Sequence, residues 1–206
     1  MHNDAMLEEL VKTCDFISKK GLAPATAGNF SARLNDTSMV MSASGKDKSA
    51  LSKYDFVVCD FQANLLSGDG KPSAEAALHG MIYQLNLATN CVLHTHSVPV
   101  TVLSMLEKQA QKITFYGYEM QKTIAGNPTH EAELDLPIFD NSQDIPKLAL
   151  EVKARWDAVK KAQGFIVRGH GLYSFGPTVF DAKRHMEGLE FLVSCEFAKR
   201  GLISHD

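Results

Sequence analysis

The sequence predicts an α/β fold in which helices pack on a mixed, largely antiparallel sheet. Two observations indicate it: short strand-like segments are grouped between residues 28 and 69, and helical patterns alternate with strands after them. The chain of 206 residues also shows no internal repeat, no linker rich in proline or serine, and no change in composition along its length. We therefore expect residues 1–206 to form a single domain.

The first part of the chain predicts one helix followed by strands. Met6, Leu10, Cys14 and Ile17 recur at helical spacing, and Gly21 ends this helix. Three short apolar segments separated by polar turns then predict strands: FSARL, MVMSAS and FVVCDF.

From Pro72 onward, the pattern predicts four helices, over roughly residues 74–87, 99–107, 145–162 and 179–199. CVLHTH predicts a buried strand before the second of these helices, and GFIVRGHGLYSFG predicts a hairpin with a histidine at its tip. The predicted inner face of the last helix consists of Phe180, Met186, Leu189, Leu192 and Val193.

Composition and charge exclude several classes of protein. Hydrophobic residues make up 45% and charged residues 22%, which is typical of globular domains and not of disordered chains. The net charge is −3 and the basic residues are scattered, so no nucleic-acid interface is predicted. No apolar run approaches the ~18 residues of a membrane span. The four cysteines form no CxxC pair, which predicts reduced thiols, and we expect a cytoplasmic protein.

Three histidines are candidates for a metal site. His94 and His96 are two residues apart on a predicted strand, so their side chains share one face and can converge on one ion. His170 lies between two glycines in a tight turn, where the backbone can come close to a ligand. A catalytic zinc ion keeps three protein ligands and one open position, which suits this trio. The alternative is three hydrogen-bonded structural histidines.

Glu75 and Glu119 are candidates for a general acid/base. Glu75 lies in the first turn of the predicted 74–87 helix, where its charge would also complement the helix dipole without any catalytic role. Glu119 is flanked by Tyr116, Tyr118 and apolar residues. Such surroundings would raise the pKa of its carboxyl group and suit it to proton transfer. The residues alone leave both roles open.

Two segments rich in small residues offer hydrogen-bond donors to a phosphate group. GNFS (residues 28–31) and SASGKDKS (residues 42–49) supply backbone N–H groups, hydroxyls, and Lys46 or Lys48. Ser73 adds a hydroxyl at the start of the next helix. Neither segment matches the P-loop pattern, so nucleotide binding is not predicted. Turns without a ligand are the alternative.

Five motifs occur in an order that resembles the class II aldolase/adducin family: GNFSAR, ASGKDK, KPSAEAALH, VLHTH and RGHGLYSFG. The resemblance covers nearly the whole chain. It implies a three-layer αβα sandwich, a sugar-phosphate substrate, and a homotetramer with active sites near subunit interfaces. It also implies one zinc ion per subunit, held by His94, His96 and His170.

Three further segments, YGYEMQK, PIFDNSQDI and HMEGLEFL, are most similar to the dehydratases of methionine salvage within that family. This similarity implies zinc-dependent dehydration of 5-methylthioribulose 1-phosphate to 5-methylthio-2,3-dioxopentyl phosphate, with Glu119 as the general acid/base. Aldolases of the family carry their catalytic glutamate in a PSSE-like motif, which is PSAE here and corresponds to Glu75. Ala74 replaces the second serine of that motif, which puts one phosphate contact of the aldolases in doubt. The implied phosphate-binding residues are Asn29, Ser44, Gly45 and Ser73.

Two other functions are compatible with the motifs. A ketose-phosphate aldolase or epimerase of the same family would depend on Glu75 rather than on Glu119. A metal-free interaction module like the head domain of adducin would share the fold, because fold alone does not determine function. The three histidines argue against such a module, since a scaffold has no need of three converging imidazoles.

Overall fold

The computed structural model describes residues 2–203, and the remaining residues of the expected 1–206 domain, Met1 and 204–206, lie outside it. The α-helices of this part of the chain are α1 (His2–Lys19), α2 (Ala76–Leu85), α3 (Val98–Leu106), α4 (Ile145–Ala154), α5 (Trp156–Ala162) and α6 (Val179–Ile203). Two short 3-10 helices are η1 (Lys53–Asp55) and η2 (Glu119–Thr123).

The strands are β1 (Asn29–Arg33), β2 (Ser38–Ser42), β3 (Phe56–Asp60), β4 (Leu65–Ser67), β5 (Cys91–Thr95), β6 (Lys112–Phe115), β7 (Leu134–Phe139), β8 (Gly164–Val167) and β9 (Gly171–Gly176). Within the described residues they form one sheet in the order β4-β3-β2-β1-β5-β9-β8-β7-β6. Strands β7 and β8 pair in parallel, and the other neighbours pair antiparallel. The mixed, largely antiparallel sheet is therefore confirmed.

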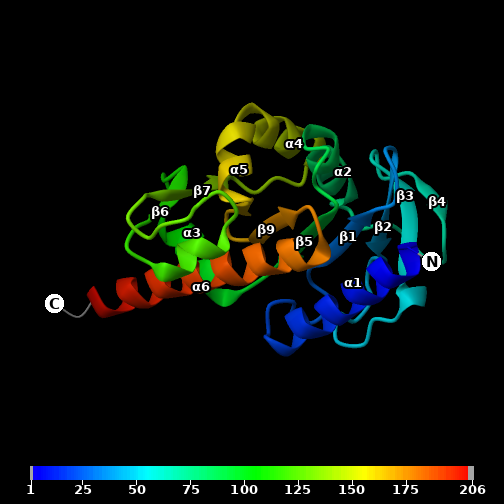
Figure 1. Ribbon diagram of the computed structural model, residues 1–206, viewed down its shortest axis with the longest axis horizontal. Coiled ribbons are helices and arrows are strands. Elements are labelled where there is room, and N and C mark those ends of the chain that lie inside the picture. Colours follow the sequence, from blue (N-terminus) through cyan, green and yellow to red (C-terminus); the bar gives the residue numbers. More distant parts are fainter. Residues whose placement is uncertain (1, 204–206) are drawn as a thin grey trace.

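Helices cover both faces of the sheet, which gives the three layers of an αβα sandwich (Figure 1). Helices α2, α4 and α5 share one core cluster with the inner residues of β5, β8 and β9. Helices α1 and α6 pack against β1 and β2 on the opposite face, and α3 joins α6 farther along that face. Strand β5 lies at the centre of the sheet, between these two helical layers.

The structure differs from the predicted elements at particular positions. Residues 145–162 form two helices, because the backbone leaves helical geometry at Arg155, whose guanidinium instead donates hydrogen bonds to Ile138 O and Gln111 O. Strands β4, β6 and β7 were not predicted. Phe180 is exposed, so its placement on the inner face of the last helix was wrong, whereas the other four predicted residues are buried.

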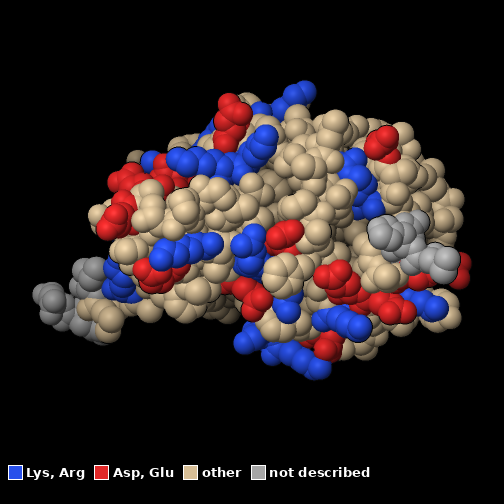
Figure 2. Space-filling view, in the orientation of Figure 1, with Lys and Arg blue, Asp and Glu red and all other residues tan. Residues whose placement is uncertain are grey.

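Lys and Arg side chains are interspersed with Asp and Glu over the face seen in Figure 2. No helix within residues 2–203 is long and apolar enough to cross a membrane.

Replacement of Gly80 by alanine is expected to destabilise the protein. Helix α2 crosses the turn after β3 so closely at Gly80 that a Cβ atom would overlap the backbone carbonyl of Phe61, which cannot rotate away. We expect the free energy of unfolding, measured by urea denaturation, to fall by about 1–3 kcal/mol. Gly201→Ala is the matched control, since a Cβ at that position of α6 meets nothing within 4 Å. Equal stability of both variants would contradict the close packing of α2.

Candidate active site

The register of three central strands brings polar side chains together on one face of the sheet. Asn29 of β1 lies opposite His94 of β5, and His94 lies opposite Tyr173 of β9. Directly opposite residues of antiparallel strands point to the same face. The Tyr173 ring stacks on His94, with 4.0 Å between ring centroids. The sheet thus fixes the position and the plane of the His94 imidazole.

His94, His96 and His170 form a compact group whose ligand nitrogens all lie within 4.8 Å of one another. His94 Nε2 lies 3.4 Å from His170 Nε2. His96 follows the last residue of β5, so the prediction that both histidines share one strand was wrong in this detail. The backbone N–H of His96 donates to Leu22 O at 2.7 Å, and this bond holds the chain where it leaves the sheet.

The turn between β8 and β9 brings His170 to the other two histidines. Gly171 makes this approach possible, because a Cβ there would overlap Thr95 O and lie 2.9 Å from the His94 ring. Gly169 has a φ of 63°, in the left-handed region that favours glycine. The predicted hairpin with a histidine at its tip is confirmed, and both flanking glycines have a structural reason.

Glu75 lies beside the three histidines. Its Oε2 is 3.4 Å from His94 Nε2 and its Oε1 is 3.3 Å from His170 Nε2. Asn29 Nδ2 donates to Glu75 Oε2 at 2.6 Å. Helix α2 begins one residue after Glu75, whose side chain makes no capping hydrogen bond. Its carboxylate therefore faces the imidazoles rather than the end of the helix.

The electrostatics of the group favour the neutral forms of His94 and His96. Burial, and next the nearby His96 and His170, hold the pKa of His94 well below its usual value. Burial, and next His170, lower the pKa of His96 to about 4. His94 Nδ1 lies 3.0 Å from Leu172 O, which suits an Nδ1–H donor and leaves the Nε2 lone pair facing the other histidines. Three imidazoles with converging ring nitrogens and an adjacent carboxylate are a donor set that fits a divalent metal ion.

A cavity of about 370 Å³ opens beside His96, His170 and Glu75. Its wall includes all four predicted phosphate-binding residues, Asn29, Ser44, Gly45 and Ser73. Residues 141–143 also line it, which was not predicted. The structure therefore brings the histidines, Glu75 and the small-residue segments together around one space.

Comparison with known proteins assigns the chain to a family. The model of the Class II Aldolase and Adducin N-terminal domain matches residues 8–197. This chain belongs to the class II aldolase/adducin family. Proteins named methylthioribulose-1-phosphate dehydratase from Pectobacterium atrosepticum and Serratia proteamaculans are 47% and 46% identical to it over 200 residues. These matches cover 97% of this chain and 97% and 98% of the two relatives.

Solved structures of the family show the same fold. An L-fuculose 1-phosphate aldolase superposes with a TM-score of 0.78 at 20% identity, covering 96% of this chain and 87% of that one. YgbL from Escherichia coli superposes with a TM-score of 0.81 at 23% identity, covering 96% and 91%. The predicted three-layer fold and the predicted family are both confirmed.

Glu119 lies away from the cavity of its own chain. It begins η2, its side chain is 67% exposed, and it lines neither this cavity nor the neighbouring one that His96 and His170 share. Its carboxylate contacts Lys122 Nζ at 2.6 Å and His130 Nδ1 at 3.0 Å. Hydrogen bonding to Lys122 lowers the pKa of Glu119. The prediction of a raised pKa was wrong, because the aromatic neighbours in the sequence do not cover this carboxylate.

Lys48 is the lysine of the 42–49 segment that reaches the cavity. Its side chain is almost fully buried and lines the wall, and burial lowers its pKa. The ammonium donates to Lys46 O at 2.9 Å and forms no ion pair with any described residue. Lys46 instead pairs with Asp55 at 2.9 Å. Of the two lysines that the sequence offered, Lys48 is the one that lines this cavity.

Glu190 is a buried carboxylate that the sequence analysis missed. It lies on α6, and it accepts hydrogen bonds from Thr95 Oγ1 at 2.5 Å and Ser97 Oγ at 2.6 Å. Those two residues flank His96, so their hydrogen bonds to Glu190 hold the chain in place on both sides of this histidine. The sequence did contain a signal for Glu190: it is an acidic residue next to Leu189, which lies on the predicted inner face of the 179–199 helix.

The stability of the metal-free protein should depend on the protonation of His79. Its ring is fully buried with Nδ1 2.7 Å from Ser31 Oγ, and burial lowers its pKa to about 3. His79 takes up a proton near pH 6.5 in the unfolded chain but only near pH 3 in the folded protein. The free energy of unfolding therefore decreases as the pH falls from about 6.5 toward 3.

His79→Gln should remove this contribution. Between pH 5.5 and 4, the plot of unfolding free energy against pH should be less steep than in the wild type by about 1.4 kcal/mol per pH unit. Chemical denaturation at a series of pH values measures both slopes. Equal slopes would show that His79 is protonated in the folded protein.

Proposed function

We propose that this protein catalyses the dehydration of 5-methylthioribulose 1-phosphate to 5-methylthio-2,3-dioxopentyl phosphate, as a cytoplasmic homotetramer of single-domain subunits. The observation that carries the proposal is the group of three converging imidazoles beside a cavity whose wall offers hydrogen-bond donors to a phosphate group. Its support comes from full-length relatives named for this activity. The reaction is a step of methionine salvage.

His94, His96 and His170 hold one zinc ion in this proposal. The lowered pKa values of His94 and His96 support it, because a metal ion binds only the neutral imidazole. When bound, the ion supplies Lewis-acid polarisation of the substrate carbonyl at C2, which makes the proton on C3 more acidic. Glu75 is within reach of the same position and is a candidate fourth ligand in the absence of substrate.

The phosphate group of the substrate binds at Asn29, Ser44, Gly45 and Ser73. Lys48 adds a positive charge to this wall. Its buried ammonium has no ion-pair partner among the described residues, so an anion in the cavity would stabilise it. The small side chains of this wall let backbone N–H groups approach the phosphate oxygens.

Glu119 is the general acid/base, and we place it in the site of a neighbouring subunit. Its position outside the cavity of its own chain and its high exposure support an action across an interface. The carboxylate removes the proton from C3, and the protonated carboxyl then delivers a proton to the hydroxyl on C4 as the C4–O bond breaks. Water leaves, and the resulting enol becomes the diketone.

Proton and phosphorus NMR of the zinc-loaded protein with 5-methylthioribulose 1-phosphate tests the reaction. We expect loss of the original C3 and C4 proton signals while the phosphate remains on a single five-carbon product. His96→Ala should abolish turnover together with zinc binding. A wild-type protein that binds zinc and leaves this substrate unchanged would refute the proposed activity.

The same experiment distinguishes the second candidate function, a ketose-phosphate aldolase or epimerase. Contact of Glu75 with His94 and His170 favours it, because Glu75 corresponds to the glutamate of the aldolase motif. Formation of dihydroxyacetone phosphate and an aldehyde would identify carbon–carbon cleavage and move the acid/base role to Glu75.

Subunit mixing tests the role of Glu119. We expect Glu119→Gln to lose most of its kcat with full zinc occupancy, and His96→Ala to lose zinc and activity. If Glu119 acts across an interface, tetramers reassembled from equal amounts of the two variants should regain about a quarter of wild-type activity, since that share of sites combines two intact parts. Recovery of no activity in verified mixed tetramers would place Glu119 in its own subunit's site or outside catalysis.

A further inference from the structure

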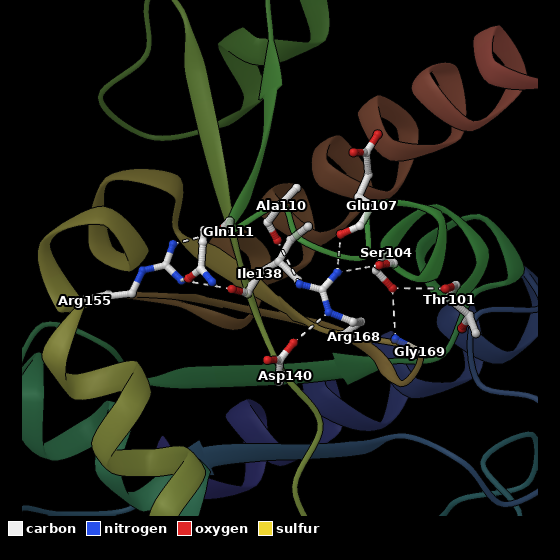
Figure 3. A network of polar contacts seen from close by, with 10 residues as sticks. All are labelled: Thr101, Ser104, Glu107, Ala110, Gln111, Ile138, Asp140, Arg155, Arg168 and Gly169. Atoms are coloured by element: carbon white, nitrogen blue, oxygen red, sulfur yellow. Dashed lines mark hydrogen bonds and ion pairs between the residues drawn. The ribbon is translucent and has the colours of Figure 1, made fainter.

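Arg168 connects the turn that carries His170 to the C-terminal end of α3 (Figure 3). Its guanidinium donates to Ser104 O at 2.7 Å, to Ala110 O at 2.8 Å, and to Glu107 O. These carbonyls lie in the last turn of α3 and in the residues that follow it. Arg168 therefore satisfies acceptors that the helix itself leaves open, where the helix dipole also favours a cation.

Two more contacts join the same turn to α3. Gly169 N donates to Ser104 Oγ at 3.0 Å, and Thr101 Oγ1 lies 3.4 Å from His170 O. Every residue of the turn from Arg168 to His170 thus contacts α3. The side chain of His170 remains directed at the other two histidines.

The other end of α3 is attached to the remaining histidines. The cap of the helix is Ser97, which directly follows His96, and its Oγ accepts a hydrogen bond from Val100 N. Helix α3 therefore begins next to His96 and ends against the turn that carries His170. The distance between His96 and His170 depends on how this turn docks on α3.

Arg168 also reaches the wall of the cavity. Its Nε donates to Asp140 Oδ1 at 2.7 Å, and Asp140 directly precedes the 141–143 segment that lines the cavity. The exposed carboxylate contributes little energy by itself. The contact joins the residue that follows β7 to the His170 turn.

Lysine cannot replace this arginine without loss. A guanidinium presents five donors in a rigid plane, and Arg168 uses them on three carbonyls and one carboxylate. A lysine ammonium is a compact charge with three donors on a flexible stem. It cannot reach all of the acceptors that lie around the edge of the guanidinium plane.

We propose that Arg168 is a positioning residue of the metal site, which holds His170 at the distance from His94 and His96 that one ion requires. The inference rests on the proposed metal-binding function and names a residue outside the ligand set. Groups that orient metal ligands commonly contribute 10–100-fold to metal affinity. Arg168 acts in this way through the backbone of the turn.

Arg168→Lys and Arg155→Lys form a matched pair for the test. Arg155 also donates its guanidinium to backbone carbonyls, those of Ile138 and Gln111, but it does not contact the His170 turn (Figure 3). Zinc affinity is measured by competition with a chromophoric chelator, and the visible spectrum of the Co²⁺-loaded protein reports the coordination geometry. Thermal unfolding of the metal-free proteins reports any general loss of stability.

We expect Arg168→Lys to weaken zinc binding roughly 10–100-fold and to alter the Co²⁺ spectrum. Arg155→Lys should keep both at wild-type values, even where its melting temperature falls as far. Unchanged zinc affinity in Arg168→Lys, or an equal loss in both variants, would overturn the inference. Wild-type protein that binds no metal at the histidines would instead refute the proposed metal site itself.

Ser104→Ala is the second variant, which decides the question if Arg168→Lys does not fold. It removes the acceptor of Gly169 N and keeps the guanidinium contacts. We expect a several-fold loss of zinc affinity with the same direction of change in the Co²⁺ spectrum. Wild-type affinity in a folded Ser104→Ala protein would show that docking of the turn on α3 does not control the metal site.

Discussion

The ligand nitrogens of His94, His96 and His170 lie within 4.8 Å of one another, and this convergence constrains the strands and turns around them. Two nitrogens of His94 and His170 lie 3.4 Å apart, and burial keeps His94 from taking up the proton that could bridge them. A divalent ion would be held by the ring nitrogens that converge there. Three neighbours hold the group in place: the Tyr173 ring stacks on His94, Glu190 accepts hydrogen bonds from Thr95 and Ser97, and Arg168 joins the His170 turn to Ser104 of α3.

Features with a local cause were predictable from the sequence. A histidine pair at the end of an apolar strand and a histidine between two glycines are short patterns, and the structure matches both except that His96 lies one residue beyond β5. Two of the three unpredicted strands have a physical reason. Strand β4 has only three residues, all exposed, and only two of the four residues of β6 are buried, so neither contains an apolar run of strand length. The break at Arg155 has no glycine or proline to mark it.

Features that depend on distant contacts could not be predicted. Thr95 and Glu190 are 95 residues apart in the chain, and Arg168 lies 64 residues from Ser104, so no spacing rule joins them. The prediction for Glu119 failed because residues close in the sequence do not surround its carboxylate in the fold. Its aromatic neighbours in the sequence indicate an apolar site, but the short helix turns the carboxylate toward solvent and Lys122. The surroundings of a carboxylate are determined by the elements packed around it.

X-ray absorption at the zinc edge, on protein loaded with one equivalent of zinc, determines whether the three histidines bind the metal. Three histidine ligands predict three nitrogen scatterers at about 2.0–2.1 Å, with outer-shell scattering from imidazole rings and no sulfur. In His96→Ala the imidazole scattering should fall and the zinc should dissociate readily. A sulfur shell near ~2.3 Å, or an imidazole signal that His96→Ala leaves unchanged, would contradict the account, because the metal would then lie elsewhere.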